Sequence, residues 1–176
     1  MLKICTILGT RPEIIRLSRI INQLDIVSNH LLIHTGQNFD YEMNEIFFRE
    51  LDIRKPDYFL GVNRDKLGST LGAILEETEK VLIKEIPDAI VILGDTNSAL
   101  SSIIAKRLKI PIYHLEAGNR CFDLNVPEEI NRKIVDHISD FNLVYTEHAR
   151  INLLNEGLAK RRIYKIGSPL QEVIDF

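Results

Sequence analysis

The stretch AIVILGDTNSAL, residues 89–100, indicates the fold of this chain. Five apolar residues run without alternation into a glycine and an aspartate, and a segment compatible with a helix follows. An unbroken apolar run is typical of a strand that is covered on both faces, as in a parallel sheet. Similar short runs occur at residues 2–9, 31–36, 110–116, 141–146 and 163–167. The sequence therefore predicts six buried strands.

Helical patterns lie between these runs. Apolar residues recur every three or four positions in residues 11–24 and 66–84, which places them on one helix face. Thr10 and Glu13 have the spacing of a capping box at the start of the first of these helices. Strands that alternate with helices imply right-handed crossovers and an α/β fold with a doubly wound parallel sheet, which binds ligands at the carboxyl ends of its strands. Further helices are predicted near residues 41–51, 97–108, 128–139 and 147–156.

The composition is that of one ordinary soluble domain. The chain has 176 residues, of which 22 are Lys or Arg and 25 are Asp or Glu, so it lacks the basic excess of most nucleic-acid-binding proteins. No apolar run reaches the roughly 20 residues of a membrane span, and the first residues lack the pattern of a signal peptide. Two cysteines, Cys5 and Cys121, are too few for a secreted disulfide framework. We expect a cytoplasmic protein that acts on a small molecule, with neither nucleic acid nor membrane as partner.

Three carboxylates stand where the predicted strands meet the following turns and helices. Asp95 follows one apolar run, Glu116 ends the next, and Glu128 opens the helix predicted at 128–139. Carboxylates that share a cleft push their pKa values apart and so provide both an acid and a base. We therefore predict that Asp95, Glu116 and Glu128 line one cleft and are catalytic.

Two of these acids have a structural alternative. Asp95 could cap the helix that begins near Asn97, and Glu128 could form a capping box with Asn125. Glu116 precedes an Ala-Gly pair rather than a helix, so no cap accounts for it. Four arginines could bind a phosphate or orient these acids, although a solvated helix surface is an equal alternative for Arg16; they are Arg11, Arg16, Arg120 and Arg132.

The sequence shows no pattern for a metal or a nucleotide cofactor. The five histidines form no pair at metal-ligand spacing, and we expect His34 and His114, which lie in predicted strands, to be core residues. The turn GTRPE, residues 9–13, matches neither the GxGxxG pattern of dinucleotide sites nor the P-loop pattern. We therefore predict no cofactor and no metal.

Five motifs resemble, in order, those of the non-hydrolysing UDP-N-acetylglucosamine 2-epimerases. They are GTRPEIIRL (9–17), HTGQN (34–38), LGDTNSAL (93–100), HLEAGNR (114–120) and PEEINRKIVDHIS (127–139). The last two motifs, with the loop that joins them, are most similar to the branch that acts on UDP-2-acetamido-2,6-dideoxy-L-talose.

The resemblance implies a glycosyltransferase-B-like fold, in which two Rossmann-like domains face each other across a cleft. Residues 1–176 would be the N-terminal catalytic domain of such an enzyme, and the C-terminal UDP-binding domain would be absent from this chain. The implied reaction is C2 epimerisation of a UDP-N-acetylamino sugar through elimination and re-addition of UDP, for capsule or O-antigen synthesis. We expect the chain alone to be inactive, and a homodimer is possible.

The resemblance also implies roles for single residues. Asp95, Glu116 and Glu128 match the essential acids of the family, and Arg11 and Arg16 match its basic substrate-site positions, although position 16 is commonly lysine. Substrate-activated relatives carry a Gln-His pattern after the second strand; this chain keeps only Gln37 and has Asn38 and Asp40 nearby, so no such activation is expected. The alternatives are the acceptor-side half of a glycosyltransferase of the same fold, or a non-catalytic assembly module.

Overall fold

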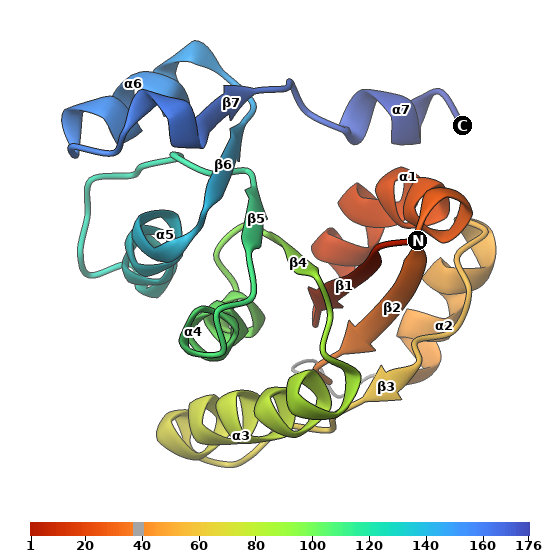
Figure 1. Ribbon diagram of the computed structural model, residues 1–176. Helices are drawn as coiled ribbons and strands as arrows, with labels where there is room; N and C mark the ends of the chain where they lie inside the picture. The colour runs from red at the N-terminus through yellow and green to blue at the C-terminus, as the bar shows by residue number, and fades with distance from the viewer. Residues whose placement is uncertain (37–40) are drawn as a thin grey trace.

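The computed structural model, which describes residues 1–36 and 41–176, has the doubly wound parallel sheet that the sequence predicts (Figure 1). The strands of the described residues pair in the order β3-β2-β1-β4-β5-β6-β7, and each pair is parallel. The chain builds outward from β1 in one direction and then restarts with β4 on the other side. The strands are β1 (Lys3–Leu8), β2 (Asn29–His34), β3 (Tyr58–Phe59), β4 (Ala89–Leu93), β5 (Ile112–Leu115), β6 (Phe141–Val144) and β7 (Ile163–Lys165).

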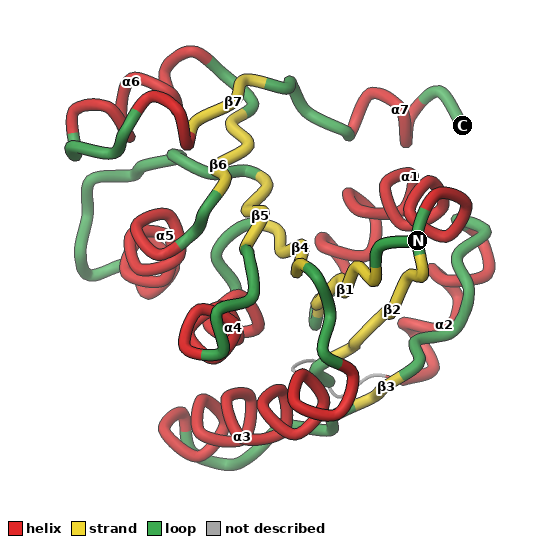
Figure 2. Tube along the Cα trace, viewed as in Figure 1, coloured by secondary structure: helices red, strands yellow, loops and turns green. Residues whose placement is uncertain are grey.

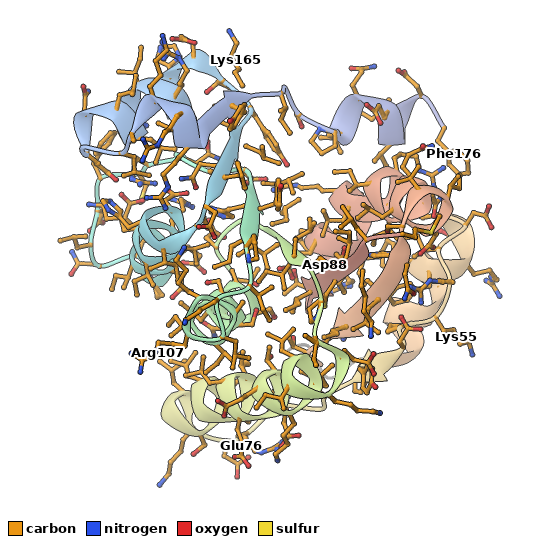
Figure 3. All side chains as sticks on the ribbon, viewed as in Figure 1. Lys55, Glu76, Asp88, Arg107, Lys165 and Phe176 are labelled. Carbon is orange, nitrogen blue, oxygen red and sulfur yellow. The ribbon has the colours of Figure 1, made fainter. Side chains whose placement is uncertain are left out.

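Helices cover both faces of this sheet (Figure 2). Helices α3, α4 and α5 pack on one face, and α1 and α2 pack on the other. Charged side chains on the outer surfaces of these layers, such as Glu76 of α3 and Arg107 of α4, point to solvent (Figure 3). The helices are α1 (Arg11–Val27), α2 (Tyr41–Glu50), α3 (Leu67–Glu85), α4 (Ser102–Arg107), α5 (Pro127–Ile138), α6 (Glu147–Asn155) and α7 (Leu170–Ile174), with 3-10 helices η1 (Asn97–Ser101) and η2 (Lys160–Arg162).

The core consists of two main layers, because successive strand residues point to opposite faces. In β4, Ile90 and Ile92 pack toward α3 and α4, whereas Val91 and Leu93 pack toward α1. All five residues of β4 are buried. This explains why its sequence is an unbroken apolar run rather than an alternating one.

The predicted elements agree with the structure apart from a few additions. All six predicted strands are present, and the structure adds β3, which has only two residues and was not predicted. The helix predicted at 97–108 begins instead as the 3-10 helix η1, and α7 was not predicted. None of the helices in residues 1–36 and 41–176 is long and apolar enough to cross a bilayer.

The switch in strand order between β1 and β4 positions the candidate site. Parallel strands that diverge from such a point leave a crevice at their carboxyl ends. The turn into α1 begins at Thr10, and the Glu13 carboxylate accepts a hydrogen bond from the Thr10 backbone N–H at 2.8 Å, as predicted for a capping box. The turn after β4, with Asp95, lies across the crevice from this helix start.

Candidate active site

A pocket of about 680 Å³ opens at the carboxyl edge of the sheet, beside this switch point. It is lined by the turns after β1 and β4 and by the first turns of α3 and α5, and we call it the edge pocket. Asp95 and Glu128 both line it, as predicted. Glu116 is not among its lining residues. It does follow the neighbouring strand, since Leu115 pairs with Leu93, two residues before Asp95. The edge pocket therefore brings together two of the three predicted acids directly.

Asp95 is held by a salt bridge from α5. Arg132 Nε donates to Asp95 Oδ2 at 2.7 Å, and Arg132 Nη2 pairs with the same oxygen. Asn131 also donates, from Nδ2, to the backbone oxygen of Asp95 at 2.9 Å. The capping alternative for Asp95 is wrong, because Thr96 is the N-cap residue of η1 and Asp95 is committed to Arg132. Because Arg132 and Asn131 hold both its side chain and its backbone, the Asp95 carboxylate keeps a defined orientation at the rim of the edge pocket.

Glu116 adopts a backbone conformation that is rare for a residue with a side chain. Its φ is 64°, in the left-handed region. Leu115 packs toward α1, so regular alternation would point Glu116 toward α5. The left-handed turn instead brings the Glu116 carboxylate to Arg16 on α1, with which it forms a salt bridge. Arg16 is thus paired with Glu116, but 38% of its side chain is exposed, so the solvated-surface alternative stays open.

Glu128 lies in the first turn of α5 and is exposed. The capping-box alternative for Glu128 is also wrong, because Val126 is the N-cap residue and makes no side-chain cap. Asn125 instead bonds to Asp123 through both its backbone N–H and its side chain. Glu128 thus presents a carboxylate to the edge pocket, where the positive end of the helix dipole favours a negative charge.

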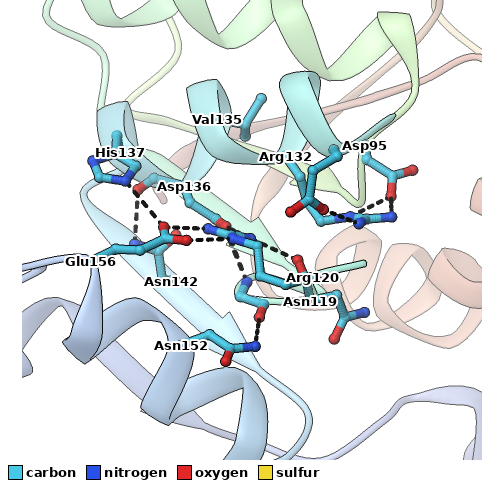
Figure 4. A network of polar contacts seen from close by, with 12 residues as sticks. Asp95, Asn119, Arg120, Arg132, Val135, Asp136, His137, Asn142, Asn152 and Glu156 are labelled. Atoms are coloured by element: carbon cyan, nitrogen blue, oxygen red, sulfur yellow. Dashed lines mark hydrogen bonds and ion pairs between the residues drawn. The ribbon is translucent and has the colours of Figure 1, made fainter. Parts of the chain in front are cut away.

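The four predicted arginines occupy different environments. Arg11 is the first residue of α1, between the pocket-lining Thr10 and Pro12. Arg132 lies between Asp95 and Glu129. Arg120 has a fully buried side chain, and its guanidinium is bound by Asp136 and by both oxygens of Glu156 (Figure 4). The predicted substrate contact of Arg120 has no support from this position, which places it in the interior of the domain.

Glu13 does more than its capping box predicts. Besides the backbone N–H groups of Gly9 and Thr10, it accepts a hydrogen bond from Thr96 Oγ1 at 2.9 Å. It therefore joins the turn after β1 to the turn after β4. Burial raises the pKa of Glu13 to about 7, and these hydrogen bonds oppose the shift.

Glu129 is a second acid whose position the sequence analysis missed. It is fully buried, and it accepts hydrogen bonds from the backbone N–H groups of Cys121 and Phe122 at 3.1 Å and 3.3 Å. Burial works to raise the pKa of Glu129, but these hydrogen bonds outweigh it and hold the pKa below its usual value. Arg132 Nη1 also donates to Glu129 at 2.9 Å. The spacing of Glu129 and Arg132, three residues apart on one helix face, was the available signal.

Tyr145 adds a polar group near Glu116. Its hydroxyl is buried and has no hydrogen-bond partner among the described residues. Burial raises the pKa of Tyr145, and the charge of Glu116 adds to this effect while Arg16 opposes it. The sequence placed Tyr145 in an apolar run, so nothing local distinguished it from a core aromatic residue.

The histidines and the segment after β2 bear on the predictions about metals and substrate activation. His34 and His114 are both buried, as expected of core histidines. Within residues 1–36 and 41–176, no group of three His, Cys, Asp or Glu side chains could hold a metal ion. Gln37, Asn38 and Asp40, on which the expectation about substrate activation depends, lie outside the described residues.

Known structures share this fold closely. A UDP-N-acetylglucosamine 2-epimerase from Rickettsia bellii superposes with a TM-score of 0.94 at 56% identity, over 99% of this chain and 47% of that one. The Methanocaldococcus jannaschii UDP-GlcNAc 2-epimerase in complex with UDP-GlcNAc and UDP superposes with a TM-score of 0.91 at 46% identity, over 95% of this chain and 47% of that one. A lipopolysaccharide outer core galactosyltransferase, at 13% identity and a TM-score of 0.68, shares the fold alone.

Sequence comparison agrees with these likenesses. The UDP-2,3-diacetamido-2,3-dideoxy-D-glucuronate 2-epimerase of Pseudomonas aeruginosa is 42% identical over 97% of this chain and 50% of its own length. This chain thus spans about half the length of the curated relatives that it matches. The family model for UDP-N-acetylglucosamine 2-epimerase matches residues 23–176. Because that match covers most of the chain and agrees with the fold, this chain belongs to the UDP-N-acetylglucosamine 2-epimerase family.

Proposed function

We propose that this chain is the carboxylate-bearing half of an enzyme that epimerises C2 of a UDP-N-acetylamino sugar. The observation that carries the proposal is the position of Asp95, Glu116 and Glu128 at the carboxyl ends of β4 and β5 and the start of α5. Epimerisation at C2 needs one group to remove a proton from one face of the sugar and another to deliver a proton to the opposite face. Carboxylates held on separate turns can serve both faces.

The proposed reaction is redox-neutral. A carboxylate takes the proton from C2, the electrons of the C2–H bond form a C1=C2 double bond, and UDP leaves C1 with the electrons of the C1–O bond. A proton then adds to the opposite face of C2, and an oxygen of UDP re-forms the bond to C1. Arg16 holds Glu116 and Arg132 holds Asp95, so each acid keeps one orientation through both steps. Arg11, which lies between the pocket-lining Thr10 and Pro12 but is not itself a lining residue, is the proposed contact for the diphosphate.

Most contacts that bind the UDP group are proposed to come from a second, C-terminal domain that faces the edge pocket. The chain spans about half the length of its relatives, and a relative has been solved with UDP-GlcNAc and UDP bound. Residues 1–176 would thus be the N-terminal Rossmann-like catalytic domain, active only when joined to its C-terminal half. We place the complete enzyme in the cytoplasm, as a possible homodimer, in the synthesis of capsule or O-antigen.

For the sugar, we propose UDP-2-acetamido-2,6-dideoxy-L-talose. Leu67 and Leu71 of α3 and Ile130 of α5 lie on the edge pocket, and among the described residues that line it there is no Lys, Arg or His. A methyl group in place of a C6 hydroxyl fits such a wall, because apolar surface gains about 25 cal/mol per Å² when it leaves water. The carboxylate of a uronate would instead face Asp95 and Glu128 without a counter-charge in this lining.

The test is an incubation of the complete enzyme in deuterated water with three UDP-sugars in parallel. They are UDP-2-acetamido-2,6-dideoxy-L-talose, UDP-GlcNAc and UDP-2,3-diacetamido-2,3-dideoxy-D-glucuronate. The proposal expects deuterium at C2 together with the epimer, with the fastest turnover for the 6-deoxy sugar. Faster turnover of the uronate would contradict the proposed sugar, and no deuterium at C2 with any of the three would contradict epimerisation itself. Sugar transfer to an acceptor without exchange at C2 would support the glycosyltransferase alternative.

A further inference from the structure

The loop between β5 and α5, residues 116–126, is tied to the interior of the domain at Gly118. The Gly118 backbone N–H lies 3.3 Å and 3.2 Å from the two carboxylate oxygens of Asp136. Its carbonyl oxygen accepts a hydrogen bond from Asn152 of α6 at 3.0 Å. Gly118 comes two residues after Glu116, so these bonds restrict where the Glu116 backbone can lie.

Asp136 is also connected to the turn that carries Asp95. His114 Nδ1 lies 2.9 Å from Asp136 Oδ1, within ion-pair distance, and this nitrogen has no hydrogen-bond partner among the described residues. The other ring nitrogen of His114, Nε2, donates to the carbonyl oxygen of Gly94 at 2.8 Å. Gly94 directly precedes Asp95, and its own N–H donates to the carbonyl oxygen of Leu115 at 3.0 Å.

The charge of Asp136 is compensated from the same loop. Arg120 Nη1 donates to Asp136 Oδ2 at 2.8 Å, and the remaining guanidinium nitrogens bind Glu156 of α6 at 2.7 Å and 2.6 Å (Figure 4). The side chains of Asp136, Arg120 and His114 are all fully buried. Burying charges costs several kcal/mol unless each is paired. Here the network joins two turns that carry candidate catalytic acids.

We propose that Asp136 is a positioning residue that holds the Asp95 turn and the Glu116 loop at a defined separation, through His114 on one side and Gly118 on the other. Arg120 balances its charge, and Glu156, at the end of α6, binds the rest of the Arg120 guanidinium. Asp136 lies at the centre of the network because its carboxylate contacts His114, Gly118 and Arg120. The functional meaning of this arrangement rests on the proposed epimerase function, since the two acids must face one sugar at the same time.

The decisive variant is Asp136→Asn in this chain. The Asp136 carboxylate accepts from Gly118 through both oxygens and forms an ion pair with Arg120, whereas asparagine has one acceptor oxygen and no charge, so the ion pair with Arg120 is lost and Gly118 keeps at most one contact. The control is Asp140→Asn, because Asp140 also accepts from a backbone N–H, that of Ile112, and pairs with a cation, Lys106, although its side chain is 33% exposed. Asp140 directly precedes β6 and bonds to the amino end of β5, away from the edge pocket, so its replacement should leave both turns unchanged.

The first measurement is amide hydrogen exchange, resolved to peptides that cover residues 94–97 and 116–120. Asp136→Asn is expected to accelerate exchange in both peptides by about tenfold, with little change in β1 and α1, because loss of a buried charged hydrogen bond weakens local structure by that order. Asp140→Asn is expected to leave both peptides near the wild-type rate. An unchanged rate at 94–97 in the Asp136 variant, or an equal increase in both variants, would overturn the proposal.

The second measurement separates positioning from folding in the complete enzyme. Asp136→Asn is expected to lower kcat per folded molecule by at least about tenfold while KM for the UDP-sugar stays within about twofold, because misplaced acids slow proton transfer without removing the nucleotide grip. A normal kcat per folded molecule would leave Asp136 a purely structural residue and refute the proposal. If Asp136→Asn fails to fold, Glu156→Gln, which weakens the same network from its 24% exposed rim, takes its place with the same expected pattern.

The two measurements also distinguish this inference from the proposed function. If the wild-type enzyme shows no epimerisation, the proposed function fails, and the exchange experiment still decides whether Asp136 holds the two turns. If the wild-type enzyme epimerises and Asp136→Asn turns over normally, the inference about Asp136 fails and the proposed function stands.

Discussion

Replacement of Gly118 by alanine should destabilise the domain through two separate effects. Gly118 has φ of 78°, where a residue with a Cβ costs about 1–2 kcal/mol relative to glycine. The added Cβ would also press against the carbonyl oxygen of Ala149 and lie 2.9 Å from its carbonyl carbon. These are backbone atoms of α6 that cannot rotate away, and such overpacking typically costs about 1–3 kcal/mol. We therefore expect Gly118→Ala to lower the free energy of unfolding by about 2–5 kcal/mol.

Gly157→Ala is the matched control. Gly157 has φ of 86°, so it carries the same left-handed cost, but a Cβ there would meet no atom within 4 Å. This variant should lose only about 1–2 kcal/mol. Urea denaturation followed by circular dichroism gives both values from the midpoint and slope of the transition.

The difference between the two glycines isolates the contact with α6. Gly118→Ala should exceed Gly157→Ala by about 1–3 kcal/mol if α6 cannot move away. Equal losses in the two variants would show that α6 shifts to accommodate the methyl group, and the reasoning that Gly118 is pinned between α5 and α6 would be refuted. Gly118→Ala should also accelerate hydrogen exchange at residues 116–120, since it displaces the loop that Asp136 holds.

Three further outcomes are expected. Because burial raises the pKa of Glu13 to about 7 from an ordinary value of 4.5, its protonated form favours the folded state; its contribution is full below pH 4.5 and is lost as the pH rises through 7. The free energy of unfolding of the wild type should therefore fall by about 3 kcal/mol between pH 4.5 and 8 relative to Glu13→Gln in urea titrations, and a relative rise would mean that the hydrogen bonds outweigh burial. Glu116→Gln in the complete enzyme should lower turnover by about 10²–10⁴-fold with little loss of UDP binding, whereas near-normal deuterium exchange at C2 would exclude Glu116 from the chemistry. Residues 1–176 alone should melt cooperatively, bind UDP negligibly in calorimetry and show no turnover, because positioning the nucleotide can contribute roughly 7–11 kcal/mol; micromolar affinity with turnover would place the nucleotide site in this half.

The elements that the sequence predicts well are those whose pattern is local. The unbroken apolar run of β4 and the helical spacing of α1 reflect burial on both faces and on one face, respectively, and each can be read from neighbouring residues. The two-residue strand β3 and the 3-10 helix that begins at Asn97 were not predicted, because neither leaves a periodic signal of sufficient length in the sequence.

The candidate site divides in the same way. Asp95 and Glu128 were placed correctly at the edge pocket, because each directly follows or opens an element whose direction the alternation predicts. Their capping alternatives could be rejected only from the coordinates. Glu116 shows the limit, because its left-handed backbone reverses the side to which its carboxylate points. The sequence gives no sign that the Glu116 side chain changes sides, since glycine rather than glutamate is the usual indication of a positive φ.

The sequence alone predicts the parallel α/β architecture and the edge of the sheet where the candidate site lies, because periodicity and strand direction are local properties of the chain. The partners of each charged residue were decided by tertiary structure: Arg16 meets Glu116, 100 residues away, and Arg120 meets Glu156, 36 residues away. Such pairs depend on strand order and on how each helix packs over the sheet, and many arrangements satisfy the same local pattern. Arg11, Arg16, Arg120 and Arg132 look equivalent as letters, yet folding buries Arg120 among carboxylates and leaves the other three at the carboxyl edge.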